Sequence, residues 1–124
     1  MTRRTSKLDR LNDIDRLPTI DEIKFLGGYT HNLEHNTGYM VSLSGQGVVK
    51  PASTCTDKDW GKYYINHRTA AKETYVGVWY NADDDTFYFD VSQWVKTKAE
   101  ALALGKANSQ LAVYEISTGD VITC

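Results

Sequence analysis

Residues 76–94, VGVWYNADDDTFYFDVSQW, hold six of the fourteen aromatic side chains of this chain, on either side of a run of three aspartates. The β-branched and aromatic residues of both arms favour extended strands. The Asn and Asp residues between the arms tolerate turn backbone angles and hydrogen-bond to their own backbone. The stretch therefore predicts a β-hairpin over residues 75–91.

Side chains alternate between the two faces of a strand, so the arms divide the hairpin into two faces. The residues predicted for the core face are Val76, Val78, Phe87, Phe89 and Val91. The candidate partner-binding residues are Tyr75, Trp79, Tyr88 and Asp90 on the other face, with Asp83, Asp84 and Asp85 in the turn. Protein interfaces favour Tyr and Trp at their centres. Either this second face is a recognition surface, or it is also buried and the aromatic density reflects packing alone.

Helical spacing and capping residues predict four helices. Threonines at positions 19, 56 and 97 each precede a Glu or Asp by three residues, a capping pattern that satisfies free backbone N–H groups at a helix start. Pro18 ends the first helix and Gly27–Gly28 ends the second. The predicted ranges are residues 8–17, 19–26, 56–71 and 97–109.

Further strands are predicted over residues 38–45, 48–49, 111–116 and 121–124. Residues 38–45 alternate in a way that predicts one buried face. Strands and helices are mixed without regular alternation, so the expected class is α+β, with a small mixed, mainly antiparallel sheet. We expect a single domain over residues 1–124, of which residues 1–7 are flexible.

Charge and hydropathy narrow the classes of function. No apolar run reaches the roughly 18–20 residues of a membrane span, and no apolar segment follows the basic start, as a secretory signal would require. Residues 1–72 carry 11 Lys and Arg against 8 Asp and Glu, whereas residues 73–124 carry 3 against 8. An RNA-binding sheet pairs aromatic with basic residues, but residues 76–95 contain neither Lys nor Arg. Direct nucleic-acid binding and membrane binding are therefore not expected.

Three stretches raise the question of chemistry. The consecutive aspartates lack the glycine and closing Glu of a calcium loop. His31 and His35 would face one zinc ion only on a helix, and their segment is predicted as a loop. Cys55 precedes a predicted helix start, where a thiolate is stabilised, and Cys124 is expected to be a second free thiol. We predict no catalytic residue, no metal site and no cofactor, and hence no enzyme.

The segments TGYMVSLSG (37–45) and YVGVWYNADDDTFYFDVSQWVKTKAEALALGKANSQLAVYEISTG (75–119) resemble those of small bacteriophage accessory proteins, a class that includes anti-defence and anti-CRISPR proteins. Many such proteins bind and disable a protein of the host. The resemblance implies a phage-encoded binding protein that acts in the host cytoplasm by occluding a host defence protein or protein complex. It implies no individual functional residue.

Other functions stay open at this point. A small-molecule or nucleotide-binding module would form its pocket between the aromatic face and the loop over residues 27–38. An enzyme would use Cys55 or the pair His31 and His35. A structural component of the phage is a further alternative, and a second copy of the chain is a candidate partner beside a host protein.

Overall fold

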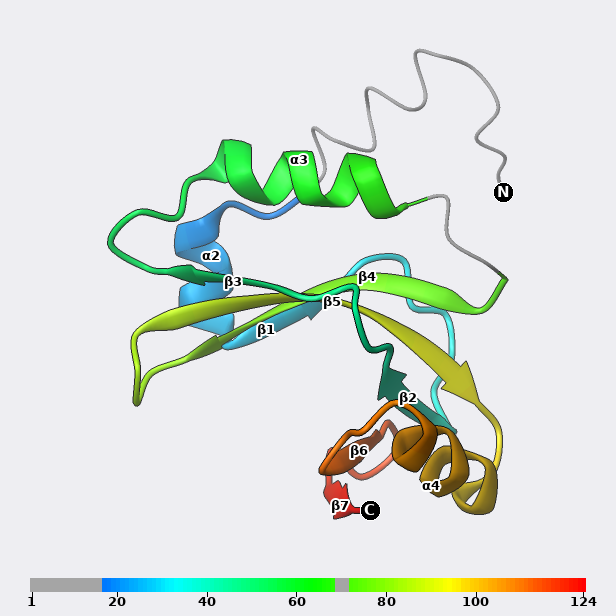
Figure 1. Ribbon diagram of the computed structural model, residues 1–124. Helices are drawn as coiled ribbons and strands as arrows, with labels where there is room; N and C mark the ends of the chain where they lie inside the picture. The colour runs from blue at the N-terminus through cyan, green and yellow to red at the C-terminus, as the bar shows by residue number, and fades with distance from the viewer. Residues whose placement is uncertain (1–16, 69–71) are drawn as a thin grey trace, which may run out of the picture.

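The computed structural model describes residues 17–68 and 72–124. The helix predicted over residues 8–17 lies outside this part except for Leu17, and so do the first seven residues and the end of the helix predicted to reach residue 71. Within the described part the fold is α+β, with helices α2, α3 and α4 around one seven-stranded sheet (Figure 1). No helix among the described residues is long and apolar enough to cross a membrane.

The predicted hairpin is confirmed as strands β4 (Thr74–Asn81) and β5 (Thr86–Val95). Val76 pairs with Val91 and Val78 with Phe89, which places the predicted core residues on one face. In the turn, Asp85 has a φ of 50°, in the left-handed region that Asn and Asp tolerate better than most residues. The residue types that predicted the turn therefore match the backbone geometry at the tip of the hairpin.

The long strand β5 organises the rest of the sheet. Along one side it pairs with β4, and along the other side it pairs first with β3 (Val48–Pro51) and then with β2 (Tyr39–Ser42). The strand order is β1-β4-β5-β2-β6-β7, with β3 off this path. The outer strands are β1 (Gly28–Thr30), β6 (Ala112–Glu115) and β7 (Val121–Thr123). Every pairing is antiparallel among the described strands.

Strand β2 differs from its prediction. Residues 38–45 predicted one buried face, but Met40 and the adjacent Val41 are both buried. The reason is the position of β2 inside the sheet, between β5 and β6. Val41 joins a hydrophobic cluster with α4, while Met40 lies between Trp94 and Tyr114 of the neighbouring strands.

Each described helix begins at a predicted capping threonine. Helices α2 (Ile20–Leu26), α3 (Asp57–His67) and α4 (Lys98–Ala107) follow Thr19, Thr56 and Thr97. In each, the threonine side chain accepts a hydrogen bond from the backbone of the third residue, whose carboxylate accepts one from the threonine N–H. These two bonds satisfy groups that would lack partners at the helix start.

The main core lies between α2, α3 and the hairpin. Trp60 and Tyr63 of α3 pack on Phe89 with ring centroids 5.6 Å and 5.2 Å apart. The predicted core residues Val76, Val78, Phe87, Phe89 and Val91 are all at most 4% exposed. A second cluster forms around Val41, Ala101 and Val113, where α4 packs on β2 and β6. Figure 1 shows α3 along the hairpin, and α4 with β6 and β7 at the far end of the sheet.

Candidate functional site

The face of the hairpin away from the core carries two stacked aromatic rings near its tip. Trp79 of β4 lies opposite Tyr88 of β5, and their ring centroids are 4.5 Å apart with planes 15° from parallel. Trp79 is 46% exposed, so a large part of its side chain is open to solvent. The second face of the hairpin is therefore accessible near the tip, where the Trp79 and Tyr88 rings stack on each other.

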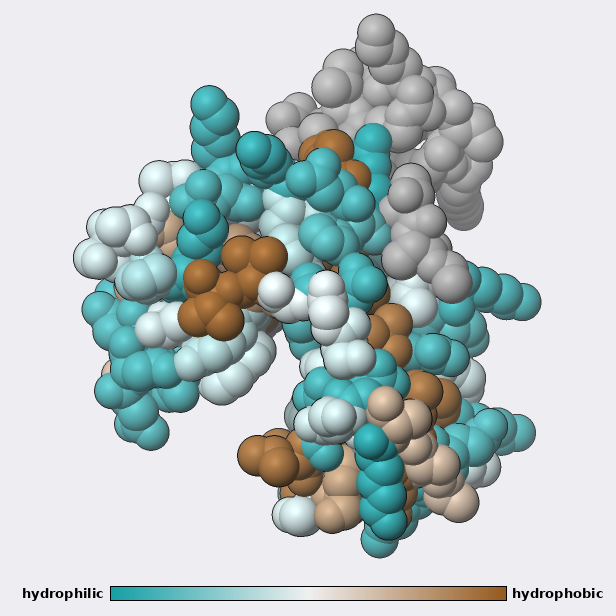
Figure 2. All heavy atoms as spheres, in the orientation of Figure 1, coloured by the Kyte–Doolittle hydropathy of each residue, from teal (hydrophilic) through white to brown (hydrophobic). Residues whose placement is uncertain are grey.

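The stacked pair is part of a row that crosses four strands. Gly28 of β1 lies beside Trp79, and Val49 of β3 lies beside Tyr88. Val49 is 59% exposed, and Figure 2 shows apolar surface over β3 among hydrophilic side chains. We call Gly28, Trp79, Tyr88 and Val49 the open row. It presents a mainly apolar strip.

The acidic turn is fixed beside the open row by tyrosine hydroxyls. The hydroxyl of Tyr88 donates a hydrogen bond to Asp84, and that of Tyr80 donates one to Asp85. These bonds raise the pKa of both tyrosines, because each carboxylate stabilises the protonated phenol. Lys24 of α2 lies 3.9 Å from Asp85. The predicted turn residues therefore form one ordered acidic element.

Two predicted partner-binding residues lie elsewhere on the same face. Asp90 is partly buried and accepts hydrogen bonds from Ser42 and Ser92, at 2.6 Å and 3.2 Å. Burial is the largest influence on its carboxyl group and raises the pKa, although the two serines act in the opposite direction. Tyr75 belongs to a separate cluster. The structure thus groups Trp79 and Tyr88 with the turn, and separates Asp90 and Tyr75 from them.

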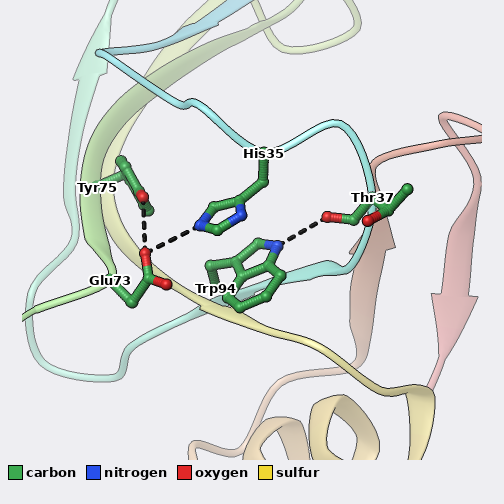
Figure 3. A network of polar contacts seen from close by, with 5 residues as sticks. All are labelled: His35, Thr37, Glu73, Tyr75 and Trp94. Carbon is green, nitrogen blue, oxygen red and sulfur yellow. Dashed lines mark hydrogen bonds and ion pairs between the residues drawn. The ribbon is translucent and has the colours of Figure 1, made fainter.

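The cluster around Tyr75 fastens the loop over residues 31–38 onto the sheet (Figure 3). The imidazole of His35 stacks on the indole of Trp94, with centroids 3.7 Å apart and planes 6° from parallel. Glu73 accepts a hydrogen bond of 2.9 Å from Tyr75 and lies 2.9 Å from the His35 ring nitrogen. These two contacts lower the pKa of Glu73. The indole N–H of Trp94 donates to the carbonyl of Thr37 at 2.8 Å.

This cluster occupies the place where a nucleotide pocket was considered. Rings 3.7 Å apart are in van der Waals contact, so no base fits between the loop and Trp94 without displacing His35. A side chain at Gly38 would also collide with the indole, since its Cβ would lie 2.3 Å from the ring nitrogen. The loop is thus packed on this part of the aromatic face.

His31 and His35 engage different neighbours. His31 is buried, its Nδ1 lies 2.7 Å from the Tyr29 hydroxyl, and its ring packs edge-on against Tyr64 at 4.8 Å. His35 instead stacks on Trp94. The described ranges contain no group of three or more His, Cys, Asp or Glu residues that could hold a metal ion.

Cys55 precedes α3 as predicted, but its surroundings do not activate it. Burial raises the pKa of the thiol to about 11, and the nearby carboxylate of Asp59 acts in the same direction. A thiol with that pKa is protonated at neutral pH, so it is a poor nucleophile. Desolvation and acidic neighbours therefore outweigh the helix terminus at Cys55, which weakens the alternative of an enzyme that uses this thiol.

Sequence reasoning missed Gly28 and Val49 as members of the open row. The Gly27–Gly28 pair was interpreted only as a helix end, although Gly27 does cap α2 with a φ of 91°. The sequence predicts a strand over residues 48–49 but not the strand with which it pairs. Neither residue carries a local signal for its position, because cross-strand pairing joins residues about 40 to 50 positions apart in the chain.

No protein-family model, curated protein or solved structure matches this chain. The chemistry of the site therefore has to be argued from its own residues. The open row and the acidic turn offer ring faces and carboxylates, groups that can contact a partner through stacking and charge.

Proposed function

We propose that the protein is a non-enzymatic binding protein that blocks a partner protein by steric occlusion, with the open row and the acidic turn as its contact surface. The observation that carries this proposal is the stacked pair of Trp79 and Tyr88, left 46% exposed at Trp79 on the tip of a hairpin. Aromatic side chains of this kind supply much of the binding energy at protein interfaces, since they bury a large area and lose little conformational freedom.

The surface is arranged before any partner arrives. Tyr80 and Tyr88 hold the two last aspartates of the turn, and the ring stack limits the rotamers of Trp79. Binding therefore has to order few side chains, which favours affinity. The other face of the hairpin is fixed by the core under α3, so the tip is supported from behind.

The target class follows from the resemblance to small bacteriophage proteins. It makes a host protein in the bacterial cytoplasm, and a defence complex in particular, the first class of target to test. Occlusion requires only that the bound hairpin covers a surface that the target needs. Steric occlusion does not require a catalytic residue.

The alternative of a nucleotide-binding module has less support. The loop over residues 31–38 is packed on Trp94. An opening of about 320 Å³ lies at α2 and is lined by Asp21, Glu22, Phe25 and Leu26. Two carboxylates in that lining would repel a phosphate group.

Affinity capture from a bacterial lysate tests the proposal. We expect the tagged wild-type protein to retain one dominant protein, which the Trp79→Ala variant loses. Leu111→Ala is the control, because Leu111 is another large apolar residue and is 87% exposed in the segment between α4 and β6. Equal capture by wild type and Trp79→Ala would show that the open row is not the contact surface. A nucleotide released from the purified protein would favour the nucleotide-binding alternative.

A further inference from the structure

One face of the Trp79 indole is turned toward Gly28, as the sheet register indicates. Its other face is stacked on Tyr88, and neighbouring strands lie about 4.8 Å apart, close to the 4.5 Å between the rings. The two rings are therefore stacked along the direction that runs from strand to strand, with their planes roughly perpendicular to that direction. The next residue in that direction is Gly28, which has no side chain to cover the indole. Position 28 of β1 therefore places no side chain against this aromatic face, and we call the space above Gly28 the slot.

The turn next to the open row is acidic. Lys24 links helix α2 to the turn, 3.9 Å from Asp85 and 5.4 Å from the centre of the Tyr80 ring. Lys24 is the only cationic residue in α2 and the turn. The turn carries the three consecutive carboxylates of Asp83, Asp84 and Asp85, and Tyr88 of the open row holds Asp84. The backbone N–H of Asp83 donates a hydrogen bond to Asn81. The charge of this turn therefore complements a basic partner.

We infer that the partner presents a basic segment with an arginine, whose guanidinium stacks on the face of Trp79 turned toward Gly28 while the acidic turn pairs with the flanking cations. This inference rests on the proposed function and names the chemistry of the partner. A guanidinium is planar, weakly hydrated and able to form paired hydrogen bonds to a carboxylate, so it fits a surface that combines a ring with acidic groups better than the compact ammonium of lysine does.

Titration with short peptides tests the inference. The probes are three peptides of nine residues in which glycine alternates with arginine, with lysine, or with the uncharged arginine analogue citrulline. Binding is followed by NMR through the indole N–H signals of the protein, of which Trp79 is assigned by substitution. We expect the arginine peptide to shift the Trp79 signal and to bind about tenfold more tightly than the lysine peptide. The citrulline peptide is expected not to bind.

Substitutions at Gly28 provide a sharper control, because they delete no side chain. A Cβ at this position would lie 3.5 Å from the Trp79 Cβ and 3.4 Å from the Val78 carbonyl oxygen, which are ordinary contacts. Gly28→Ala should therefore fold and change arginine-peptide affinity by less than about threefold. Gly28→Val should also fold, since β-branched residues suit strands. Its methyl groups cover the indole and should weaken binding by about tenfold or more.

Equal affinity of the arginine and lysine peptides would overturn the inference, as would undiminished binding to a folded Gly28→Val variant or no binding of any peptide. These outcomes would overturn the inference without deciding the proposed function, which the capture experiment tests separately. A protein captured by the wild type and lost by Trp79→Ala would still support the binding surface while excluding an arginine in the slot. Equal capture by wild type and Trp79→Ala would overturn both the proposed function and this inference.

Discussion

Tyr88 and Phe89 are adjacent in the sequence but face opposite sides of the hairpin. Phe89 is 2% exposed beneath Trp60 and Tyr63. We expect Phe89→Ala to lower the free energy of unfolding by about 3–5 kcal/mol, because it empties a buried aromatic site. Tyr88→Ala removes a ring stack and one exposed hydrogen bond, and should lower it by only about 1–2 kcal/mol. Denaturant unfolding of both variants measures this, and equal losses would show that both faces are structural.

Asp90 should make stability depend on pH in an unusual direction. Because burial raises its pKa in the folded protein, ionised Asp90 opposes folding. This penalty is absent below the ordinary carboxyl pKa of about 4 and grows as pH rises through the raised value. We expect Asp90→Asn to be more stable than wild type at pH 7, with the advantage vanishing toward pH 3. A pH-independent loss of stability in that variant would contradict this account.

Glu73 should behave in the opposite way and serves as the comparison. Contacts with His35 and Tyr75 lower its pKa, so its ionised form supports folding. That support is complete above the ordinary Glu pKa of about 4.3 and is lost as pH falls through the lowered value. We expect Glu73→Gln to be less stable than wild type at pH 7 and to approach it in acid. Unfolding of the two variants over the same pH series checks both signs.

At the scale of elements, the turn of the hairpin should be structurally tolerant. Replacing Asp83, Asp84 and Asp85 together by Asn keeps residues that accept turn geometry, including the left-handed backbone at position 85. We expect a loss below about 1 kcal/mol, since the lost carboxylate contacts are exposed. Calcium should leave the melting temperature of the wild-type protein unchanged. A calcium-dependent rise that disappears in the triple variant would identify these aspartates as ligands instead.

The hairpin and the helix starts were predictable because their signals are local. Aromatic and β-branched arms around an Asn/Asp-rich turn specify β4 and β5, and the threonines at 19, 56 and 97 mark three helix starts. The three-residue strand β1 was not predicted. It is too short to show alternation, and it forms because the chain leaving α2 pairs with β4. Burial of Met40 was missed for a similar reason, since only the strand order places β2 inside the sheet.

Long-range contacts also limited how well the exposure of the second hairpin face could be predicted from the sequence. Alternation along the hairpin identified Trp79 and Tyr88 as sharing a face. It could not reveal that a distant loop covers Tyr75 and Trp94, or that serines enclose Asp90. Nor could it reveal that Gly28, which has no side chain, is the residue paired with Trp79. Sequence pattern therefore assigned residues to faces, whereas exposure depended on segments far away in the chain.

At the scale of the whole molecule, stability should come from packing alone. Two hydrophobic clusters are built along one sheet, and both cysteines are free thiols. A chain of 124 residues can bury enough surface to fold without a metal or a disulfide. We expect thermal melts with and without EDTA, and with and without reductant, to coincide. A decrease of more than about 5 °C in either comparison would correspond to roughly 1 kcal/mol of stability from a metal or a disulfide.

The central claim is that the exposed stack on the hairpin is the contact surface for a partner protein. Its most direct test is calorimetric titration of the purified, captured partner with wild type, Trp79→Ala and Leu111→Ala. We expect Trp79→Ala to weaken binding by about 2 kcal/mol or more, as central aromatic residues do, while it stays folded with a loss of unfolding free energy of about 1–2 kcal/mol, like Tyr88→Ala. Leu111→Ala should bind as wild type does. Unchanged affinity of a folded Trp79→Ala variant would contradict the claim.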